Sequence, residues 1–196
     1  MIIDEIISDL SADYGSCLSE IKRIYQCDDA EAAGYASFFA ELLLNFKSKF
    51  PESRELFIVR APGRVNLIGE HTDYNALPVL PIAIEKNIII VFSINDDNTV
   101  RLYNHDSRFD YREFRIEGET KPYPTGDWGN YIKAGCFWLP SENKKGFNAL
   151  VYGNIPNASG LSSSSALVVA SSLAFLRANG IEIDKPKLAD ALSKAE

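Results

Sequence analysis

The chain has 196 residues, enough for one substantial domain or for one domain with a helical extension. Hydrophobic residues make up 46% and charged residues 24%, the balance of an ordinary globular protein. The net charge of −7 and the scattered basic residues argue against nucleic acid as the main partner. No apolar run reaches the ~18 residues of a membrane span.

The cysteines and the N-terminus both favour a cytoplasmic location. Cys17, Cys27 and Cys136 are an odd number without metal-type spacing, which favours reduced thiols. The first residues, "MIIDEIISDL", are acidic and lack the basic start of a secretory signal peptide.

Helices are predicted first and strands second. Residues 1 to 50 are predicted to be helical, because apolar residues recur three and four positions apart until Pro51. From about residue 56, "LFIVRA" and "KNIIIVFSI" have the β-branched, apolar character of buried strands. The segments "TVRLYN" and "YREFRI" alternate as half-exposed strands do, and "INDDNT" has the composition of a turn. His105 is predicted to be a surface loop residue without a role.

The second half alternates helices with strands. "DWGNYIKAGCFWL" predicts a helix that begins after Asp127, and "FNALVYGN" predicts a strand. A small-residue loop then leads into a long helix that ends at Gly180, and "KPKLADALSKAE" opens another helix. This order predicts an α+β fold, with residues 1–50 as a helical N-terminal extension and residues 51–196 as the main domain.

The segment "GLSSSSALVVAS" joins a strand to a helix through a glycine and four serines, a composition that suits an anion site. Backbone N–H groups at a helix N-terminus lack partners and carry the positive end of the helix dipole. The segment has neither the Walker pattern nor the G-x-S-x-G pattern of a nucleophile elbow. The alternative is a plain helix cap, because serine caps helices and small residues pack them closely.

A second motif is "RAPGRVNLIGEHTDYN", residues 60–75, which sets Glu70, His71 and Asp73 close together behind an apolar run. With "VLPIAIE" a few residues on, it closely resembles the galactokinase signature. "IPNASGLSSSSAL" resembles the phosphate loop of the galactokinase, homoserine, mevalonate and phosphomevalonate kinases, and "DWGNYIKAG" is similar to a helix of that superfamily. The resemblance covers roughly residues 55 to 196.

The resemblance implies the N-terminal domain of this superfamily, a mixed sheet packed with helices. It implies transfer of the γ-phosphoryl group of Mg²⁺-bound ATP to the C1 hydroxyl of α-D-galactose. Arg64 matches the family's arginine near the transferred phosphate, where its fixed charge would stabilise the phosphoryl oxygens. The sugar hydroxyls would be bound by Glu70, His71, Thr72 and Asp73. The alternatives are a buried structural role for His71 and a turn-capping role for Asp73.

The same resemblance implies a nucleotide site. Trp128 matches an aromatic residue that contacts adenine, although it could also be a plain core residue. Ser164 and Glu196 match the two magnesium ligands. The nucleotide-binding positions of the phosphate loop match Ala158, Ser159, Gly160, Leu161, Ser162, Ser163 and Ser164.

Two departures from the family pattern matter. The family carries a catalytic aspartate in a "G-I-M-D-Q" segment beyond the glutamate matched by Glu196, and no segment here resembles it. We therefore expect an incomplete, nearly inactive N-terminal part that self-associates through surface meant for a missing domain. Ala158 and Leu77 stand where the family usually has glycine, and a positive φ at Ala158 would cost roughly 1 kcal/mol.

Two other functions remain open at this point. One is an N-acetylgalactosamine kinase or another sugar kinase. "HTDYN" favours galactose, but the pocket for the 2-substituent of the sugar would lie partly in the missing half of such a kinase. The other is a non-catalytic sensor that binds galactose and ATP to control a partner. The intact Arg64 and the uninterrupted "SSSSAL" favour an enzyme.

Overall fold

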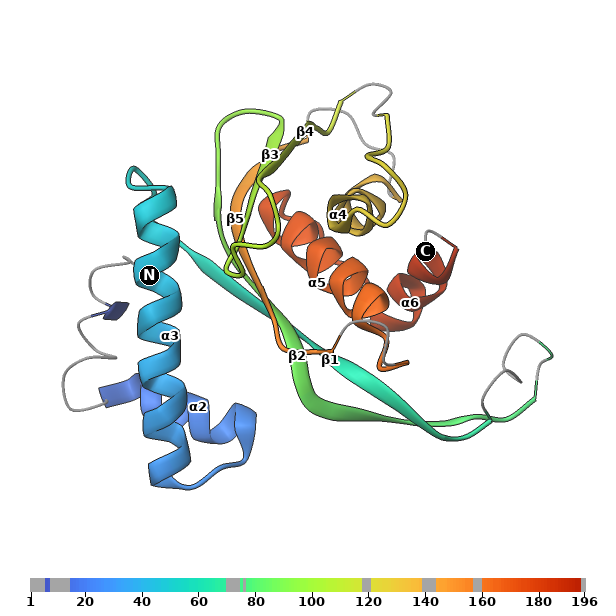
Figure 1. Cartoon of the computed structure of the whole chain (residues 1–196), viewed down its shortest axis with the longest axis horizontal. Coiled ribbons are helices and arrows are strands. Elements are labelled where there is room, and N and C mark those ends of the chain that lie inside the picture. The colour runs from blue at the N-terminus through green and yellow to red at the C-terminus, as the bar shows by residue number, and fades with distance from the viewer. Residues whose placement is uncertain are drawn as a thin grey trace.

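The computed structural model describes residues 6–7, 15–69, 75, 77–117, 121–138, 144–156 and 160–194. Within this part, five strands form one sheet in the order β1-β2-β5-β3-β4 (Figure 1). The β3–β5 pair is parallel and the other pairs are antiparallel, so the predicted mixed sheet is confirmed. The strands are β1 (Phe57–Ile68), β2 (Leu80–Ile94), β3 (Thr99–Asn104), β4 (Arg112–Arg115) and β5 (Phe147–Gly153).

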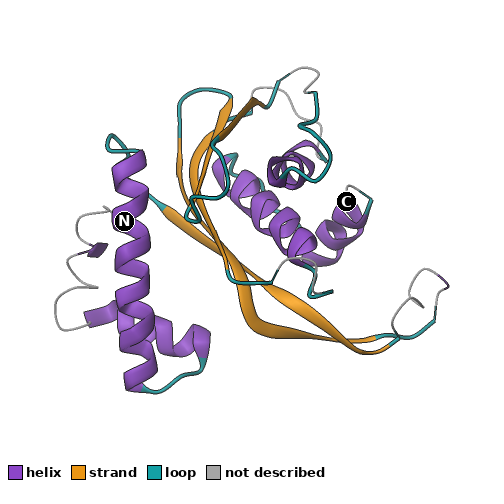
Figure 2. Cartoon of the chain, viewed as in Figure 1, coloured by secondary structure: helices purple, strands orange, loops and turns teal. Residues whose placement is uncertain are grey.

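Helices cover both faces of the sheet (Figure 2). One face carries the helical N-terminal extension, and the other carries the helices of the second half, as the α+β prediction requires. The division at residue 50 stays a prediction. None of the described helices is long and apolar enough to cross a bilayer. The helices are α2 (Gly15–Tyr25), α3 (Asp29–Lys49), α4 (Trp128–Phe137), α5 (Ser163–Ala178) and α6 (Lys185–Ser193).

The second half of β2, residues 87–93, is buried on both faces, which explains the continuous apolar run of residues 88–92. Ile88, Ile90 and Phe92 belong to the core on the side of α4 and α5. Ile89 and Val91 belong to the core under α3. Because successive side chains of a strand point to opposite faces, one uninterrupted apolar run supplies both cores.

Close packing of α4 on α5 depends on a glycine. A Cβ atom at Gly135 would clash with Ser171 Oγ and with the backbone of Val168 in α5. Near the end of α4, the indole N–H of Trp138 donates to Ser172 Oγ at 2.6 Å. These contacts hold the two helices side by side. Their N-terminal ends, at Trp128 and Ser163, lie at the same end of the pair.

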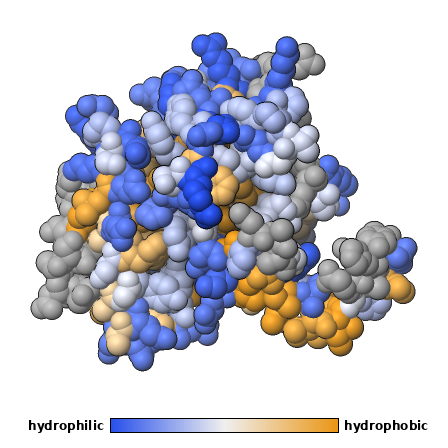
Figure 3. Space-filling model, viewed as in Figure 1, coloured by the Kyte–Doolittle hydropathy of each residue, from blue (hydrophilic) through white to orange (hydrophobic). Residues whose placement is uncertain are grey.

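Strand β1 is longer than the sequence predicts, because it continues through Pro62 and Gly63 to Ile68. A register irregularity between Pro62 and Arg64 accommodates the proline, which an edge strand tolerates. Beyond this point β1 and β2 project from the body as a hairpin, here called the arm (residues 64–69 and 77–83; Figure 1). The arm exposes six large apolar side chains (Figure 3): Leu67, Ile68, Leu77, Val79, Leu80 and Ile82.

His105 lies in the loop directly after β3, as predicted, but it has specific contacts there. It is only partly exposed, and its Nδ1 lies 3.1 Å from Asn45 Nδ2 of α3. Its backbone N–H donates to the carbonyl of Val151 at 2.8 Å. His105 therefore joins the end of β3 to β5 and to α3.

Candidate functional site

A cavity of about 760 Å³ lies where the N-terminal ends of α4 and α5 meet the loop after β3 and the end of β5. We call it the α5 pocket. Trp128, Ser163 and Ser164, three of the nucleotide-binding residues that the sequence predicts, line it together. Its volume is in the range of small-molecule sites. Further polar and aromatic lining residues are Asn104, Asp106, Arg108, Phe109, Tyr131 and Asn154.

The loop before α5 has the backbone shape of an anion site. Gly160 and Ser162 both have positive φ, +70° and +58°, and the first regular helical hydrogen bond runs from Ala166 N to Ser162 O at 3.0 Å. The Ser162 side chain makes no capping hydrogen bond, and the first turn of α5 contains no acidic residue. The positive end of the helix dipole is therefore not neutralised by a carboxylate from its own first turn.

The predicted catalytic arginine is attached to this loop through its backbone. Arg64 N donates to Leu161 O at 3.2 Å, which links β1 to the segment leading into α5. A Cβ atom at the preceding Gly63 would lie only 3.0 Å from the same Leu161 oxygen. The Arg64 side chain is exposed and does not line the α5 pocket.

Trp128 is both a core residue and a pocket residue, so the two alternatives from the sequence are compatible. It is 8% exposed, belongs to the core between the sheet and α5, and lines the α5 pocket. Its ring packs edge-on against Phe109, with centroids 6.3 Å apart. Its Nε1 is buried without a hydrogen-bond partner among the described residues.

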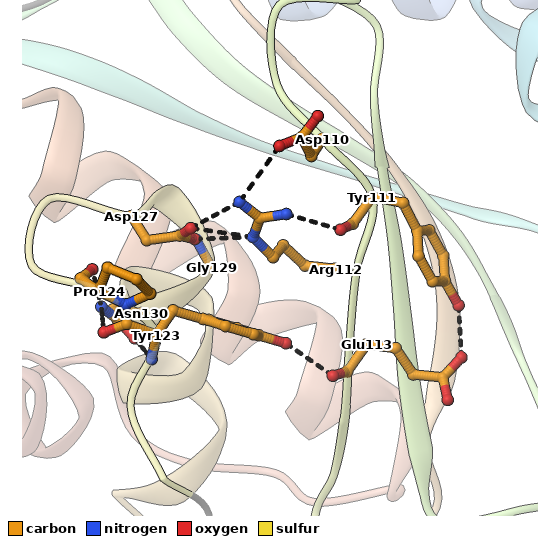
Figure 4. A network of polar contacts seen from close by, with 9 residues as sticks. All are labelled: Asp110, Tyr111, Arg112, Glu113, Tyr123, Pro124, Asp127, Gly129 and Asn130. Carbon is orange, nitrogen blue, oxygen red and sulfur yellow. Dashed lines mark hydrogen bonds and ion pairs between the residues drawn. The ribbon is translucent and has the colours of Figure 1, made fainter.

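An ion pair fixes the start of α4, directly before Trp128 (Figure 4). Asp127 caps the helix by accepting from Gly129 N at 2.9 Å. The guanidinium of Arg112 on β4 donates to Asp127 Oδ2 through Nε at 2.9 Å and through Nη2 at 2.7 Å. These bonds hold the pKa of Asp127 below its usual value. The Tyr123 hydroxyl also donates to the Glu113 carbonyl at 2.6 Å, which ties the segment before α4 to the same strand.

Sequence reasoning missed the residues after β3. Asn104, Asp106 and Arg108 line the α5 pocket, although no motif marks them. Arg108 Nη2 donates to Asp106 Oδ2 at 2.6 Å, and Arg108 Nε donates to both oxygens of the same carboxylate. This pairing lowers the pKa of Asp106 to about 2. The only signal in the sequence is the polar composition of "YNHDSR", which is equally typical of a surface loop.

Several predicted site residues lie outside the part that the structure describes. In the described ranges, no three His, Cys, Asp or Glu side chains gather as a metal site. The predictions for the sugar, for part of the phosphate loop and for the second magnesium ligand stay predictions. The residues concerned are Glu70, His71, Thr72, Asp73, Ala158, Ser159 and Glu196.

Comparisons with known proteins agree with this fold. The family model "Galactokinase galactose-binding signature" matches residues 44–94, and "GHMP kinases N terminal domain" matches residues 130–196. Mevalonate kinase from Methanococcus jannaschii has the same fold, with a TM-score of 0.61 over 72% of this chain and 46% of that chain, at 22% identity. The fold is therefore that of the N-terminal domain of the GHMP kinases.

More similar proteins narrow the family. The chain is 38% identical to a Candida maltosa galactokinase, covering 73% of this chain and 71% of that protein. It is 40% identical to the Candida parapsilosis galactokinase over 78% of this chain. A galactose complex of Lactococcus lactis galactokinase matches with a TM-score of 0.72 and 30% identity, over 81% of this chain and 42% of that chain. The chain belongs to the galactokinase family, and it spans 32% of the Candida parapsilosis relative.

Proposed function

We propose that the protein phosphorylates galactose at the C1 hydroxyl with Mg²⁺-ATP. One observation carries the proposal: Trp128, Ser163 and Ser164, which the sequence matches to a nucleotide site, line one pocket at a helix N-terminus. The family relatives named galactokinase, and the galactose bound to the Lactococcus lactis relative, support the choice of sugar.

In the proposed complex, the ATP phosphates lie at the N-terminus of α5 and the adenine lies against Trp128. A phosphate there gains from the helix dipole and from backbone N–H donors, and no carboxylate of the first turn opposes it. The hydroxyl of Ser164 is a hard oxygen donor, which suits magnesium. One protein hydroxyl is enough where phosphate oxygens and water complete the coordination, with Glu196 as the predicted second ligand.

Arg64 supplies the positive charge for phosphoryl transfer. The C1 hydroxyl of galactose forms a bond to the γ-phosphorus, the bond from that phosphorus to the bridging oxygen breaks, and ADP leaves while the hydroxyl loses its proton. Negative charge on the transferred oxygens favours a nearby guanidinium. Glu70, His71, Thr72 and Asp73 are proposed to hold the sugar hydroxyls. No residue is assigned as the proton acceptor.

The remaining proposals concern location and self-association. None of the three cysteines is part of a disulfide, which supports a reducing, cytoplasmic location. The exposed apolar side chains of the arm support self-association, because a monomeric protein rarely exposes a contiguous apolar surface of this kind.

Activity is tested in a chimera, because the galactokinase relatives extend well beyond the matched part. This chain replaces the matching part of the Candida parapsilosis galactokinase, and ADP release is measured with galactose and Mg²⁺-ATP. We expect galactose-dependent turnover that Arg64→Ala reduces at least ~100-fold, while Arg54→Ala, another exposed arginine on the approach to β1, has little effect. A chimera that binds both ligands and releases no ADP would instead be a sensor and would contradict the proposal.

A further inference from the structure

A second pocket lies on the opposite face of the sheet, between α3 and the strands β2 and β5. We call it the α3 pocket. Its volume is about 370 Å³, and its lining includes Glu31, Gly34, Tyr35, Phe38, Asn87 and Tyr152. Such a volume suits a small ligand. The proposed phosphoryl transfer does not use this face.

Gly34 lies in the second turn of α3, inside the helix, where glycine weakens a helix relative to alanine. The fold gives no reason for this glycine. Its φ is not positive, and a Cβ atom built on it has no neighbouring atom within 4 Å. Because Gly34 lines the α3 pocket, a longer side chain there would enter the pocket. The glycine therefore keeps the pocket open.

One buried polar atom at the same place lacks a partner in the part of the chain that the structure describes. Asn87 is 4% exposed, and its amide nitrogen donates to the Glu85 carbonyl at 2.7 Å. Its Oδ1 is buried without a hydrogen-bond partner among the described residues. The backbone N–H of Asn87 donates to Asn154 Oδ1 at 2.7 Å, and both residues line the pocket. Buried amides normally find partners, and an orphaned one beside a pocket suggests a ligand.

The remaining lining decides the class of that ligand. Tyr35, Phe38 and Tyr152 offer aromatic surface, on which the C–H face of a ring can pack. Amide, phenol and carboxylate groups together donate and accept, as hydroxyl groups require. Glu31 lines the pocket, and the guanidinium of Arg60 lies 4.6 Å from the centroid of the Tyr25 ring, which also lines it. Charges of both signs therefore lie at or beside the pocket, which favours a neutral ligand.

We propose that the α3 pocket binds a small neutral polyhydroxylated ring, the size of a monosaccharide, at a site separate from the proposed substrate site. The test is a titration of the ¹⁵N-labelled chain with D-galactose, D-glucose, myo-inositol and adenosine, followed through backbone amide signals. Gly34, Tyr35 and Asn87 report the α3 pocket. Asn154 is not used because it lines both pockets. Ile68 and Leu80 on the arm report the proposed substrate site independently.

We expect saturable shifts at the three reporters with at least one of the polyols, with a dissociation constant in the millimolar range or tighter. Gly34→Phe fills the pocket and should weaken this binding at least 10-fold. Ser37→Leu is the control, one turn further along α3 and outside the pocket. Glu31→Ala, an exposed position that alters the lining without filling it, should weaken binding at least 3-fold in a chain that remains folded.

The proposal is overturned if no polyol shifts the three reporters at millimolar concentrations, or if adenosine alone shifts them. It is also overturned if both Gly34→Phe and Glu31→Ala bind as the unchanged chain does. Galactose-dependent shifts confined to the arm would leave the proposed function standing while contradicting the second site. The two failures are therefore distinguishable.

Discussion

The backbone N–H of Arg64 donates to the carbonyl oxygen of Leu161, at a distance of 3.2 Å. This bond joins the strand that carries the predicted catalytic arginine to the loop that begins α5. The two signature segments are almost 100 residues apart in the sequence. In the fold they share a hydrogen bond, so a change in the position of one alters the other.

Gly63→Ala tests this contact. The added Cβ atom would lie 3.0 Å from Leu161 O and 3.2 Å from Ile155 Cδ1, which is tight enough to push β1 away from the loop. We expect a stability loss of about 1–2 kcal/mol and about 5-fold weaker binding of an Mg²⁺-ATP analogue, measured by urea unfolding and calorimetry. Gly34→Ala is the matched control, since its Cβ atom meets nothing within 4 Å. Equal affinities for the two variants would show that the contact is irrelevant to the nucleotide.

Arg112→Gln tests the ion pair at the start of α4. The side chains of Arg112 and Asp127 are 22% and 9% exposed, and the bonds between them are charge-assisted. We expect a loss of about 1.5–3 kcal/mol in the free energy of unfolding. Arg101→Gln removes a more exposed pair with Asp97 and should cost under about 1 kcal/mol. Equal losses in urea denaturation would contradict a special role for the Arg112 pair.

The same pair predicts a pH dependence. Because Arg112 lowers the pKa of folded Asp127, this carboxylate contributes stability above its unfolded pKa of about 3.9. That contribution is lost as the pH falls through the lower, folded pKa. Between about pH 5 and pH 3, urea midpoints should therefore fall less in Arg112→Gln than in the unchanged chain. Parallel curves for the two proteins would rule out this linkage.

Self-association through the arm is tested by sedimentation velocity across a wide concentration range. We expect a concentration-dependent species that Leu80→Ser weakens, because Leu80 is 52% exposed within the apolar surface of the arm. Leu44→Ser is the control, with a similar exposure of 54% on α3. A protein that stays strictly monomeric at all concentrations would contradict the prediction.

The helices and strands were largely predictable from local patterns. The continuous apolar run around Ile90 predicts a buried strand, and the structure has that strand, buried on both faces. Gly180 was predicted to end α5, and its φ of +62° is the left-handed conformation that glycine supplies after a helix. Asp127 was predicted to begin α4, and it caps that helix.

The parts that could not be predicted depend on tertiary contacts. Strand β1 continues through Pro62 because β1 is an edge strand that pairs only with β2. The sequence around Pro62 does not show that this strand lies at an edge. Asp106 and Arg108 enter the α5 pocket because β3 lies beside β5, a pairing that no local pattern contains. Ser162 has a positive φ, whereas the sequence raised the question of a positive φ only at Ala158.

The central claim is that the α5 pocket binds the phosphates of a nucleotide. The most direct test is calorimetric titration of this chain with Mg²⁺ and a non-hydrolysable ATP analogue, compared with Ser163→Asp. An aspartate in the first turn of α5 stabilises the helix through its interaction with the positive end of the dipole, and its negative charge repels phosphate. We therefore predict unchanged or higher thermal stability and at least ~100-fold weaker binding, equivalent to about 2.7 kcal/mol, with Ser37→Asp on α3 as the charge control. Binding of equal strength to Ser163→Asp, or no binding to the unchanged chain, would contradict the claim.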